Sequence, residues 1–477
     1  MRVLIWLHRW WGVLFCLLFA MWFASGILMH FVPFPARSEP EHFAGSVPID
    51  PKQIAHGPAE AVAASGIDDA LRVRLVGRSD QPIYLISGPS QVRAVRALDL
   101  GDAGVHSDRT ALNIAIAEAR HRGLDASHAS AASLVAYDQW TVSGDYDSDR
   151  PLYRVALNDI NGTDLYVSSV TGDIVVVTTR RERLLNYVGS IAHWIYPTAL
   201  RHHGQVWSAL LWWLSLLATI GASLGVITGL TRLGSSSRRT TPPYQGLQAW
   251  HYRFGLVCAP FILSWIFSGW LSMDNGLLFS GNAVRAGALA ITDSSAWDNL
   301  RPDEVHRLPA GLTDIEWFAF DGRIYRRARK GASVQGLVQA APEADPASPP
   351  RAFLQQNEIN SVARRLGRDC GDASAIAADD AYEGMRTTSA DPMFRIACGD
   401  IWFDIDGGTG ELVNRLDPSR RIYRWLFGGL HTLNFPWLQH LPWLRSILIV
   451  VLCGCGLVFS LTGVVLAWRR LRNTMAM

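Results

Sequence analysis

The sequence is short of the features that mark several common classes of protein. Its 44 Lys and Arg residues are nearly balanced by 42 Asp and Glu, so neither a basic surface for nucleic acid nor a charged binding tail is indicated. It contains no G-x-G-x-x-G motif and no P-loop, and the segment 232–249 between two apolar runs is too short for a flavin or nicotinamide domain. A chain of 477 residues still exceeds what one hydrophobic core usually organises. We therefore expect several structural units, without nucleic acid as a partner.

Apolar residues are abundant, at 49% of the chain, and the 19 Trp suit the interface between lipid and water. Four apolar runs are each long enough to cross the roughly 30 Å of hydrocarbon in a bilayer. Arg residues before the first run and after the second and fourth place both termini in the cytoplasm. The sequence therefore predicts a multi-pass protein of the bacterial inner membrane, in contact with lipid. The predicted divisions are transmembrane helices at 1–30, 207–231, 250–278 and 446–468, periplasmic segments at 31–206 and 279–445, a cytoplasmic loop at 232–249 and a cytoplasmic tail at 469–477.

The two halves of the chain resemble each other. Residues 7–26 (LHRWWGVLFCLLFAMWFASG) align without a gap with residues 250–269 (WHYRFGLVCAPFILSWIFSG), and LYRVA at 152–156 corresponds to MFRIA at 393–397. Matches in the same order predict an internal duplication, with two parallel repeats related by a twofold axis along the membrane normal. Each periplasmic segment mixes helix-like and strand-like periodicity, which favours a small α+β domain in each repeat. The clearest elements are helices at 110–122 and 352–367 and strands at 152–157, 164–169 and 173–179.

Histidines beside membrane spans are costly to bury and therefore indicate function. The alignment pairs His8 with His251 at the cytoplasmic ends of the first and third spans, and His193 with His431 just before the second and fourth spans. Two imidazoles that face each other across a twofold axis can supply the axial ligands on both faces of a b-type haem. The sequence thus predicts two haems, one near each membrane face. Ordinary interfacial histidines without a ligand role are the alternative for each pair.

Other residues are secondary candidates for the same sites. His30 ends the first span, and its counterpart Met273 would allow His/Met ligation of the outer haem. Further histidines near the spans could replace or supplement the outer pair, and arginines could pair with haem propionates. These candidates are His202, His203 and His440 for the iron, Arg183 and Arg421 for the outer propionates, and Arg9 and Arg253 for the inner ones.

The six Cys residues divide by location. Four lie within the apolar runs, where they serve as small apolar residues. Cys370 and Cys398 lie in the same periplasmic segment. Because the periplasm is oxidising, the sequence predicts a disulfide between these two.

Several short motifs resemble those of the PepSY-associated transmembrane family. HRWWG at 8–12 and HYRFG at 251–255 are similar to the start of that family's helices, and GGLH before the fourth span and LTGVVLAWRR at its end are similar to its closing elements. LYVSSVTGDIV and WFDIDGGTGELV resemble its PepSY strand and turn. The family includes inner-membrane haem proteins that reduce ferric siderophores. Its histidine positions fall on His8, His251, His193 and His431, although AHW and TLNFP depart from its usual motifs at the outer pair.

The resemblance implies a dihaem reductase that passes electrons across the membrane to a periplasmic ferric siderophore or other metal chelate. Since the chain carries no flavin or nicotinamide motif, the electrons would come from quinol or from a separate donor. Two other functions remain open at this stage. One is a haem-free PepSY module that binds or regulates an envelope peptidase or another partner. The other is a permease, against which the lack of acidic or broken-helix features in the spans argues.

Overall fold

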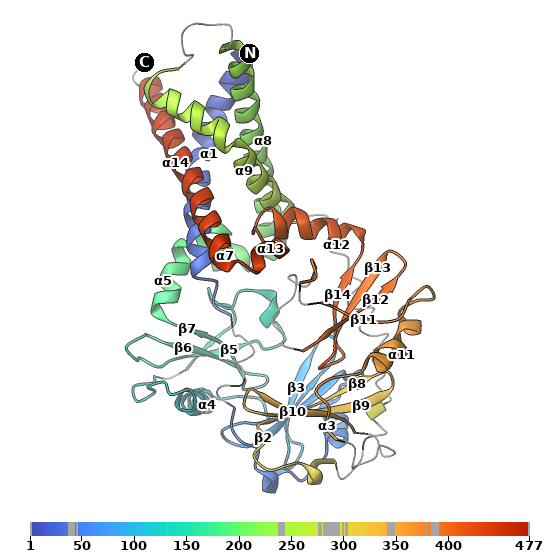
Figure 1. Cartoon of the computed structure of the whole chain (residues 1–477). Coiled ribbons are helices and arrows are strands. Elements are labelled where there is room, and N and C mark those ends of the chain that lie inside the picture. Colours follow the sequence, from blue (N-terminus) through green and yellow to red (C-terminus); the bar gives the residue numbers. More distant parts are fainter. Residues whose placement is uncertain are drawn as a thin grey trace.

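The computed structural model describes most of the chain, and four of its helices are long and apolar enough to cross a membrane. The described residues are 2–36, 43, 46–130, 132–236, 244–274, 279, 296–297, 300, 304–340, 349–377, 379–382 and 391–475. The long helices are α1 (Arg2–Phe31), α8 (Gly204–Ser236), α9 (Gly246–Ser272) and α14 (Pro442–Met475). They form one bundle, with the sheets at one end and both termini at the other (Figure 1). The four predicted spans are confirmed as helices of transmembrane length, although positions 275–278 of the third lie outside the described residues.

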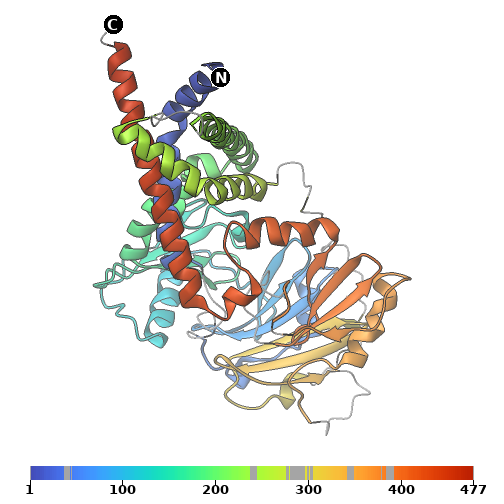
Figure 2. The same ribbon diagram turned by 45° about the horizontal axis from the view of Figure 1, so that its top comes forward.

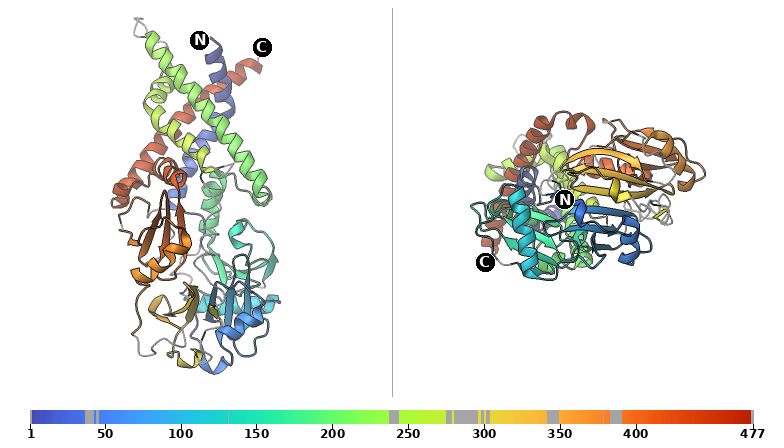
Figure 3. Two further views of the ribbon diagram at one scale, coloured as in Figure 1. Left: turned by 90° about the vertical axis from the view of Figure 1, so that its right-hand side faces the viewer. Right: turned by 90° about the horizontal axis from the view of Figure 1, so that it is seen from below.

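In the bundle, the first long helix of the chain lies against the last. α1 packs most extensively against α14, and α8 against α9, while the contacts of α1 with α8 and of α9 with α14 are smaller. Small residues permit the closest approach, since a Cβ atom on Gly456 of α14 would lie only 2.7 Å from the Phe23 ring of α1. Figure 3 shows the helices crossing above the sheets. The apolar centre of the bundle includes Phe15, Phe23, Ala218, Cys258, Ile262, Trp265, Ile449 and Cys453.

A six-stranded sheet contains strands from both of the segments predicted to be periplasmic, 31–206 and 279–445, which we call the outer segments. Its order is β10-β9-β8-β1-β2-β3, and β1 pairs with β8 in antiparallel register, with Arg74 opposite Glu316. Alternation in β1 places Val73 and Leu75 in an apolar core. Arg72 and Arg74 face the other way and pair with acidic residues of β8. Figure 2 shows the blue strands of the first segment beside the yellow strands of the second. The strands are β1 (Arg72–Gly77), β2 (Pro82–Ser87), β3 (Val92–Arg96), β8 (Asp314–Phe320), β9 (Arg323–Lys330) and β10 (Ser333–Gln339).

Each outer segment also contributes a four-stranded antiparallel sheet with a helix packed on it. The first has the order β4-β5-β6-β7 and the second β11-β12-β13-β14, and each helix buries its apolar stripe on its own sheet. The predicted helices and strands are thus confirmed, with small differences at their ends. The elements are α4 (Asp108–His121), β4 (Ser133–Val135), β5 (Leu152–Ala156), β6 (Asp164–Ser168) and β7 (Ile174–Thr178), then α11 (Gln356–Leu366), β11 (Ser374–Ala375), β12 (Met393–Cys398), β13 (Ile401–Asp406) and β14 (Leu412–Leu416).

Short helices connect these sheets to the bundle. In the first segment they carry the chain from β7 to α8, and in the second from β14 to α14 (Figure 1). The predicted disulfide between Cys370 and Cys398 is present. The connecting helices are α5 (Arg180–Val188), α6 (Ser190–His193), α7 (Thr198–Arg201), α12 (Pro418–Tyr423), the π-helix η6 (Arg424–Gly429) and α13 (Pro436–Gln439); α3 (Pro58–Ser65), η1 (Pro51–Gln53), η2 (Gly144–Tyr146) and η4 (Glu304–Arg307) lie elsewhere in the outer segments.

Candidate functional site: two histidine pairs in the helix bundle

His8 of α1 and His251 of α9 line one cavity at the end of the bundle that carries the termini. The cavity has a volume of about 970 Å³, and residues of all four long helices form its wall. Its size lies at the upper end of the roughly 300–1,000 Å³ that is usual for cofactor and ligand pockets. Two imidazoles from different helices therefore share a space large enough for a cofactor.

Glycines give both rings the room that they occupy. A Cβ atom on Gly225 of α8 would lie 3.0 Å from Cε1 of His8, and a Cβ atom on Gly463 of α14 would lie 3.5 Å from Cε1 of His251. The His251 ring also stacks on Phe459, with ring centroids 4.5 Å apart. Each histidine thus lies against a glycine of a neighbouring helix. A Cβ atom at Gly225 would crowd the His8 ring, whereas one at Gly463 would make an ordinary van der Waals contact with His251.

The hydrogen bonds of His251 determine which ring nitrogen carries the proton. Thr462 Oγ1 donates to the carbonyl of Phe459 at 2.6 Å, so it accepts from Nδ1 of His251 at 2.8 Å. Nε2 is then the nitrogen with a free electron pair, as a metal ligand requires. Nδ1 of His8, by contrast, is buried without a hydrogen-bond partner in the described part of the chain. A buried polar atom of this kind is rare and suggests an unfilled interaction.

His193 and His431 form a second pair at the opposite end of the bundle, with ring centroids 6.4 Å apart. Ser25 Oγ donates to the Met21 carbonyl at 2.6 Å and so accepts from Nδ1 of His193 at 3.0 Å. Nδ1 of His431 lies 3.1 Å from the Trp265 carbonyl, to which it can only donate. Both rings therefore present an unprotonated Nε2, the same tautomer as His251.

The surroundings of the outer pair match those of the inner pair. A Cβ atom on Gly26 of α1 would lie 3.7 Å from Cε1 of His193, and one on Gly269 of α9 would lie 3.1 Å from Cε1 of His431. Burial lowers the pKa of both histidines, so the rings are neutral at pH 7. Neutral imidazoles with a fixed tautomer and a glycine behind each ring can hold a transition metal or a haem iron.

The comparison with known protein families agrees with the motifs in the sequence. A family model described as the PepSY-associated TM region matches residues 5–470, which is nearly the whole chain. The chain belongs to this family. None of the curated proteins compared with it matches.

The secondary histidines of this PepSY-associated protein lie apart from the two pairs. Nε2 of His30 hydrogen-bonds to Ser446 at 2.8 Å, and His202 packs on the Tyr137 ring with centroids 4.1 Å apart. No hydrogen bond or ring contact joins these two residues to His193 or His431 in the described ranges. His203 and His440 are exposed, and Met273 is the C-cap of α9.

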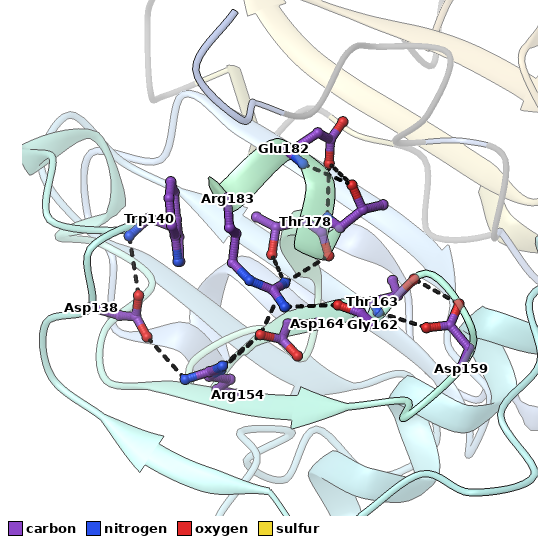
Figure 4. Close-up of polar contacts among 11 residues, drawn as sticks. Asp138, Trp140, Arg154, Asp159, Gly162, Thr163, Asp164, Thr178, Glu182 and Arg183 are labelled. Carbon is purple, nitrogen blue, oxygen red and sulfur yellow. Dashed lines mark hydrogen bonds and ion pairs between the residues drawn. The ribbon is translucent and has the colours of Figure 1, made fainter. Parts of the chain in front are cut away.

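The two arginines predicted to bind outer propionates already have partners in the PepSY-associated protein. Arg183 pairs with Asp164 at 3.1 Å and donates to Thr178 Oγ1 at 2.8 Å and to the Gly162 carbonyl at 2.8 Å, as Figure 4 shows. Arg154 shares the same carboxylate. This network ties the start of α5 to the strands of the first sheet.

The remaining arginines differ in their positions. Arg421 donates to the Asp400 carbonyl at 2.7 Å and stacks on Trp402, with its guanidinium carbon 4.3 Å from the ring centre. Arg9 lines the inner cavity, whereas Arg253 is exposed and is absent from the cavity wall formed by the described residues. Arg9 is therefore the one of these four arginines that lies at a histidine pair.

Sequence reasoning missed the residues that surround the histidines. The dipeptides Ser25-Gly26 and Ser268-Gly269 align between the two halves, and each supplies a serine near the histidine Nδ1 and a glycine beneath the ring. That alignment is the signal that could have identified them. Gly225, Gly463 and Thr462 carry no such signal, because many glycines and threonines occur in membrane helices.

Proposed function

We propose that this PepSY-associated protein binds one b-type haem between His8 and His251 and another between His193 and His431, and that it conducts electrons across the membrane. The single observation that carries the proposal is the tautomer shared by His251, His193 and His431, with Nδ1 donating and Nε2 free. A hydrogen bond at Nδ1 orients a histidine ligand and raises its basicity. This tautomer in three of the four proposed ligands supports bis-histidine ligation at the outer pair and ligation by His251 at the inner one.

The inner site fits a haem by three criteria. Its cavity is of cofactor size, at about 970 Å³. Its donor set is a pair of imidazoles from different helices, which suits low-spin haem iron. Nδ1 of His8 lacks a hydrogen-bond partner within the described residues.

At the outer site, the distance between the rings of His193 and His431 suits a shared haem iron. Metal–imidazole bonds are about 2 Å long, and the ring centre lies about 1 Å beyond the nitrogen, so two imidazoles on one metal have centroids about 6 Å apart. The centroids of His193 and His431 are 6.4 Å apart. The pair therefore has the separation that a single ion between two rings needs.

The two sites are well placed for transfer across a membrane. His8 lies on α1, and Gly26, which contacts His193, lies 18 residues further along the same helix. At 1.5 Å per residue this places the sites about 27 Å apart along the helix, close to the hydrocarbon thickness of about 30 Å. One site would face the cytoplasm and the other the periplasm, with the sheets outside an inner membrane.

The proposal includes a duplicated architecture. The strand order β10-β9-β8-β1-β2-β3 is unchanged when the two segments are exchanged, and each segment adds one four-stranded sheet. The helix pairs α1–α14 and α8–α9 are also exchanged by such a twofold relation. These regularities support an origin of each histidine pair from one ancestral position, with both members facing the axis.

The reaction that we propose is reduction of a ferric chelate outside the membrane. Bound haem supplies a one-electron couple. The four histidines would hold the two haem irons, and haem held in this way would supply electron transfer rather than binding of a small molecule at the metal. One electron from quinol or a separate donor converts Fe(III) in the chelate to Fe(II), which hard oxygen chelators bind less tightly. A ferric siderophore is the substrate class that the family resemblance favours.

An absorption spectrum tests the cofactor. Protein purified in detergent should show a Soret band and, after dithionite reduction, α-bands corresponding to about two haems per chain. His8→Ala and His431→Ala should each remove about half of the haem, whereas His440→Ala, at an exposed histidine, is the matched control and should remove none. Haem-free wild-type protein would refute the proposal and favour a module that regulates an envelope partner.

A vesicle assay tests the reaction. Proteoliposomes would contain a reductant inside and a ferric hydroxamate with an Fe(II) indicator outside. Wild-type protein should produce Fe(II), and the His8→Ala and His431→Ala variants should each lose at least 90% of the rate, because an electron must pass both sites. Equal rates in wild type and both variants would contradict the electron path.

A further inference from the structure

Arg424 is a buried cation that forms no ion pair with a carboxylate of the described residues. Its side chain is 1% exposed, Nε donates to the Ala381 carbonyl at 2.8 Å, and Nη2 donates to the Asn434 carbonyl at 2.6 Å. Nη1 is buried and has no hydrogen-bond partner among the described residues. Arginine cannot shed its proton in a protein, so a buried guanidinium without a counter-ion is strongly unfavourable.

Another buried arginine, Arg327, has the ion-paired carboxylate that Arg424 lacks among the described residues. Arg327, which is 2% exposed, pairs with Asp391 at 2.7 Å. Arg424 forms no ion pair with any described acidic residue. Burial lowers the pKa of Arg424 and outweighs the attraction of Asp380, whose carboxylate is paired with Arg395 at 3.0 Å. Two N–H groups of Arg424 are therefore available to an anion.

Arg445, near the start of α14, donates to the same loop as Arg424. Its Nε and Nη2 both donate to the Thr432 carbonyl, at 3.1 and 2.9 Å, and it too forms no ion pair in the described part of the chain. The loop that the two arginines hold directly follows His431, and Arg424 begins the π-helix η6 that leads to this histidine. π-helical turns are frequent at functional sites. Two arginines that form no ion pair among the described residues thus both donate to the loop that follows His431.

The first half of the chain has neutral residues at the matching positions. At the spacing that pairs His193 with His431, Arg424 falls on Asn186 and Arg445 on Trp207. Asn186 is fully paired, donating to the carbonyls of Pro33 and Glu182 and accepting from Ser190. At these two matched positions only the second half carries a positive charge. In the first half the nearby Arg201 stacks on the rings of Tyr196 and Trp207 instead.

We propose that Arg424 and Arg445 bind the two propionate carboxylates of the outer haem, an inference that rests on the haem ligation proposed above. A guanidinium matches a carboxylate in shape and can donate two parallel hydrogen bonds to it. The arginines neutralise the propionates, and the propionates supply the counter-charge that Arg424 and Arg445 lack. The two arginines also determine which way round the porphyrin binds, because the edge that carries the propionates must face them.

A comparison of two porphyrins tests this inference. Full-length protein that lacks His8 and His251, produced under haem limitation, has only the outer site to fill. Titration with hemin and with hemin dimethyl ester, whose carboxylates are blocked, separates the propionate contacts from the rest of the pocket. Arg424→Gln should weaken hemin binding at least tenfold and leave binding of the ester unchanged. Arg424→Lys should restore part of the affinity for hemin.

Arg421→Gln is the matched control, because Arg421 is a nearby arginine that contacts carbonyls and the Trp402 ring. It should change neither titration. Equal weakening of hemin and ester by Arg424→Gln would show that Arg424 only supports packing and would overturn the inference. Unchanged affinity for both ligands would also overturn it.

The redox potential provides a second measurement in protein with both haems. Removing a positive charge beside the outer haem favours its ferric state, so Arg424→Gln should lower the midpoint potential of that haem alone. Unchanged potentials of both haems would overturn the inference. If protein that retains Arg424 binds neither hemin nor its ester at the outer site, the proposal of haem binding itself fails. That result differs from those that overturn only the role of Arg424 and Arg445.

Discussion

Replacing Gly225 with alanine should displace His8 and empty the inner site selectively. The new Cβ atom would lie 3.0 Å from Cε1 and 3.4 Å from Nδ1 of His8. Carbon atoms in contact prefer about 3.5–4.0 Å, so the ring must move by roughly 0.5–1 Å. Metal ligands tolerate deviations of about 0.2 Å. Overpacking of this size costs about 1–3 kcal/mol, which corresponds to roughly a 5- to 150-fold loss of haem affinity.

Gly12→Ala is the matched control for Gly225→Ala. Gly12 lines the same cavity, but a Cβ atom there would have no neighbour within 4 Å. We expect about one haem per chain for the Gly225 variant and about two for the Gly12 variant, measured as pyridine haemochrome against protein concentration. Titration of haem into haem-limited protein gives the affinity. Two haems bound with unchanged affinity and spectrum in the Gly225 variant would refute the reasoning.

Three further predictions follow from the geometry. Gly269→Ala, whose Cβ would lie 3.1 Å from Cε1 of His431, should release the outer haem and spare the inner one, as read from the reduced α-bands. Replacing Cys370 and Cys398 with serine should lower the free energy of unfolding of the outer segments by about 3–4 kcal/mol, since the bridged residues are 28 positions apart; unchanged denaturant midpoints would contradict this. Because burial lowers the pKa of His193, its neutral ring adds stability above its unfolded pKa of 6.5, and this stability is lost as pH falls. The melting temperature of haem-free protein should therefore fall more steeply below pH 6.5 in wild type than in His193→Gln.

Local patterns in the sequence predicted the parts of this protein that depend on nearby residues. The apolar runs predicted four helices of transmembrane length, and alternation predicted β5, β6 and β7. The pairing of Cys370 with Cys398 followed from their location in one segment, and the structure confirms it. The alignment of the halves matched His193 with His431, whose ring centroids lie 6.4 Å apart in the structure.

Features that depend on distant segments could not be predicted in this way. The pairing of β1 with β8 joins residues about 240 positions apart, and alternation within each strand does not reveal its neighbour. The contact of His8 with Gly225 depends on how two helices cross. Arg424 resembles any other arginine in the sequence, and only the fold shows that it is buried without an acidic partner in the described residues.

The shared sheet also determines how the chain can be divided. If the chain were cut between α8 and α9, each fragment would retain three strands of the central sheet and would expose the free backbone N–H and C=O groups of β1 or β8. Such an edge pairs with another strand, so a single half would be stable only as a dimer whose assembly depends on concentration. Covalent linkage removes that dependence. The two members of each histidine pair therefore stay together at any concentration of the protein in the membrane.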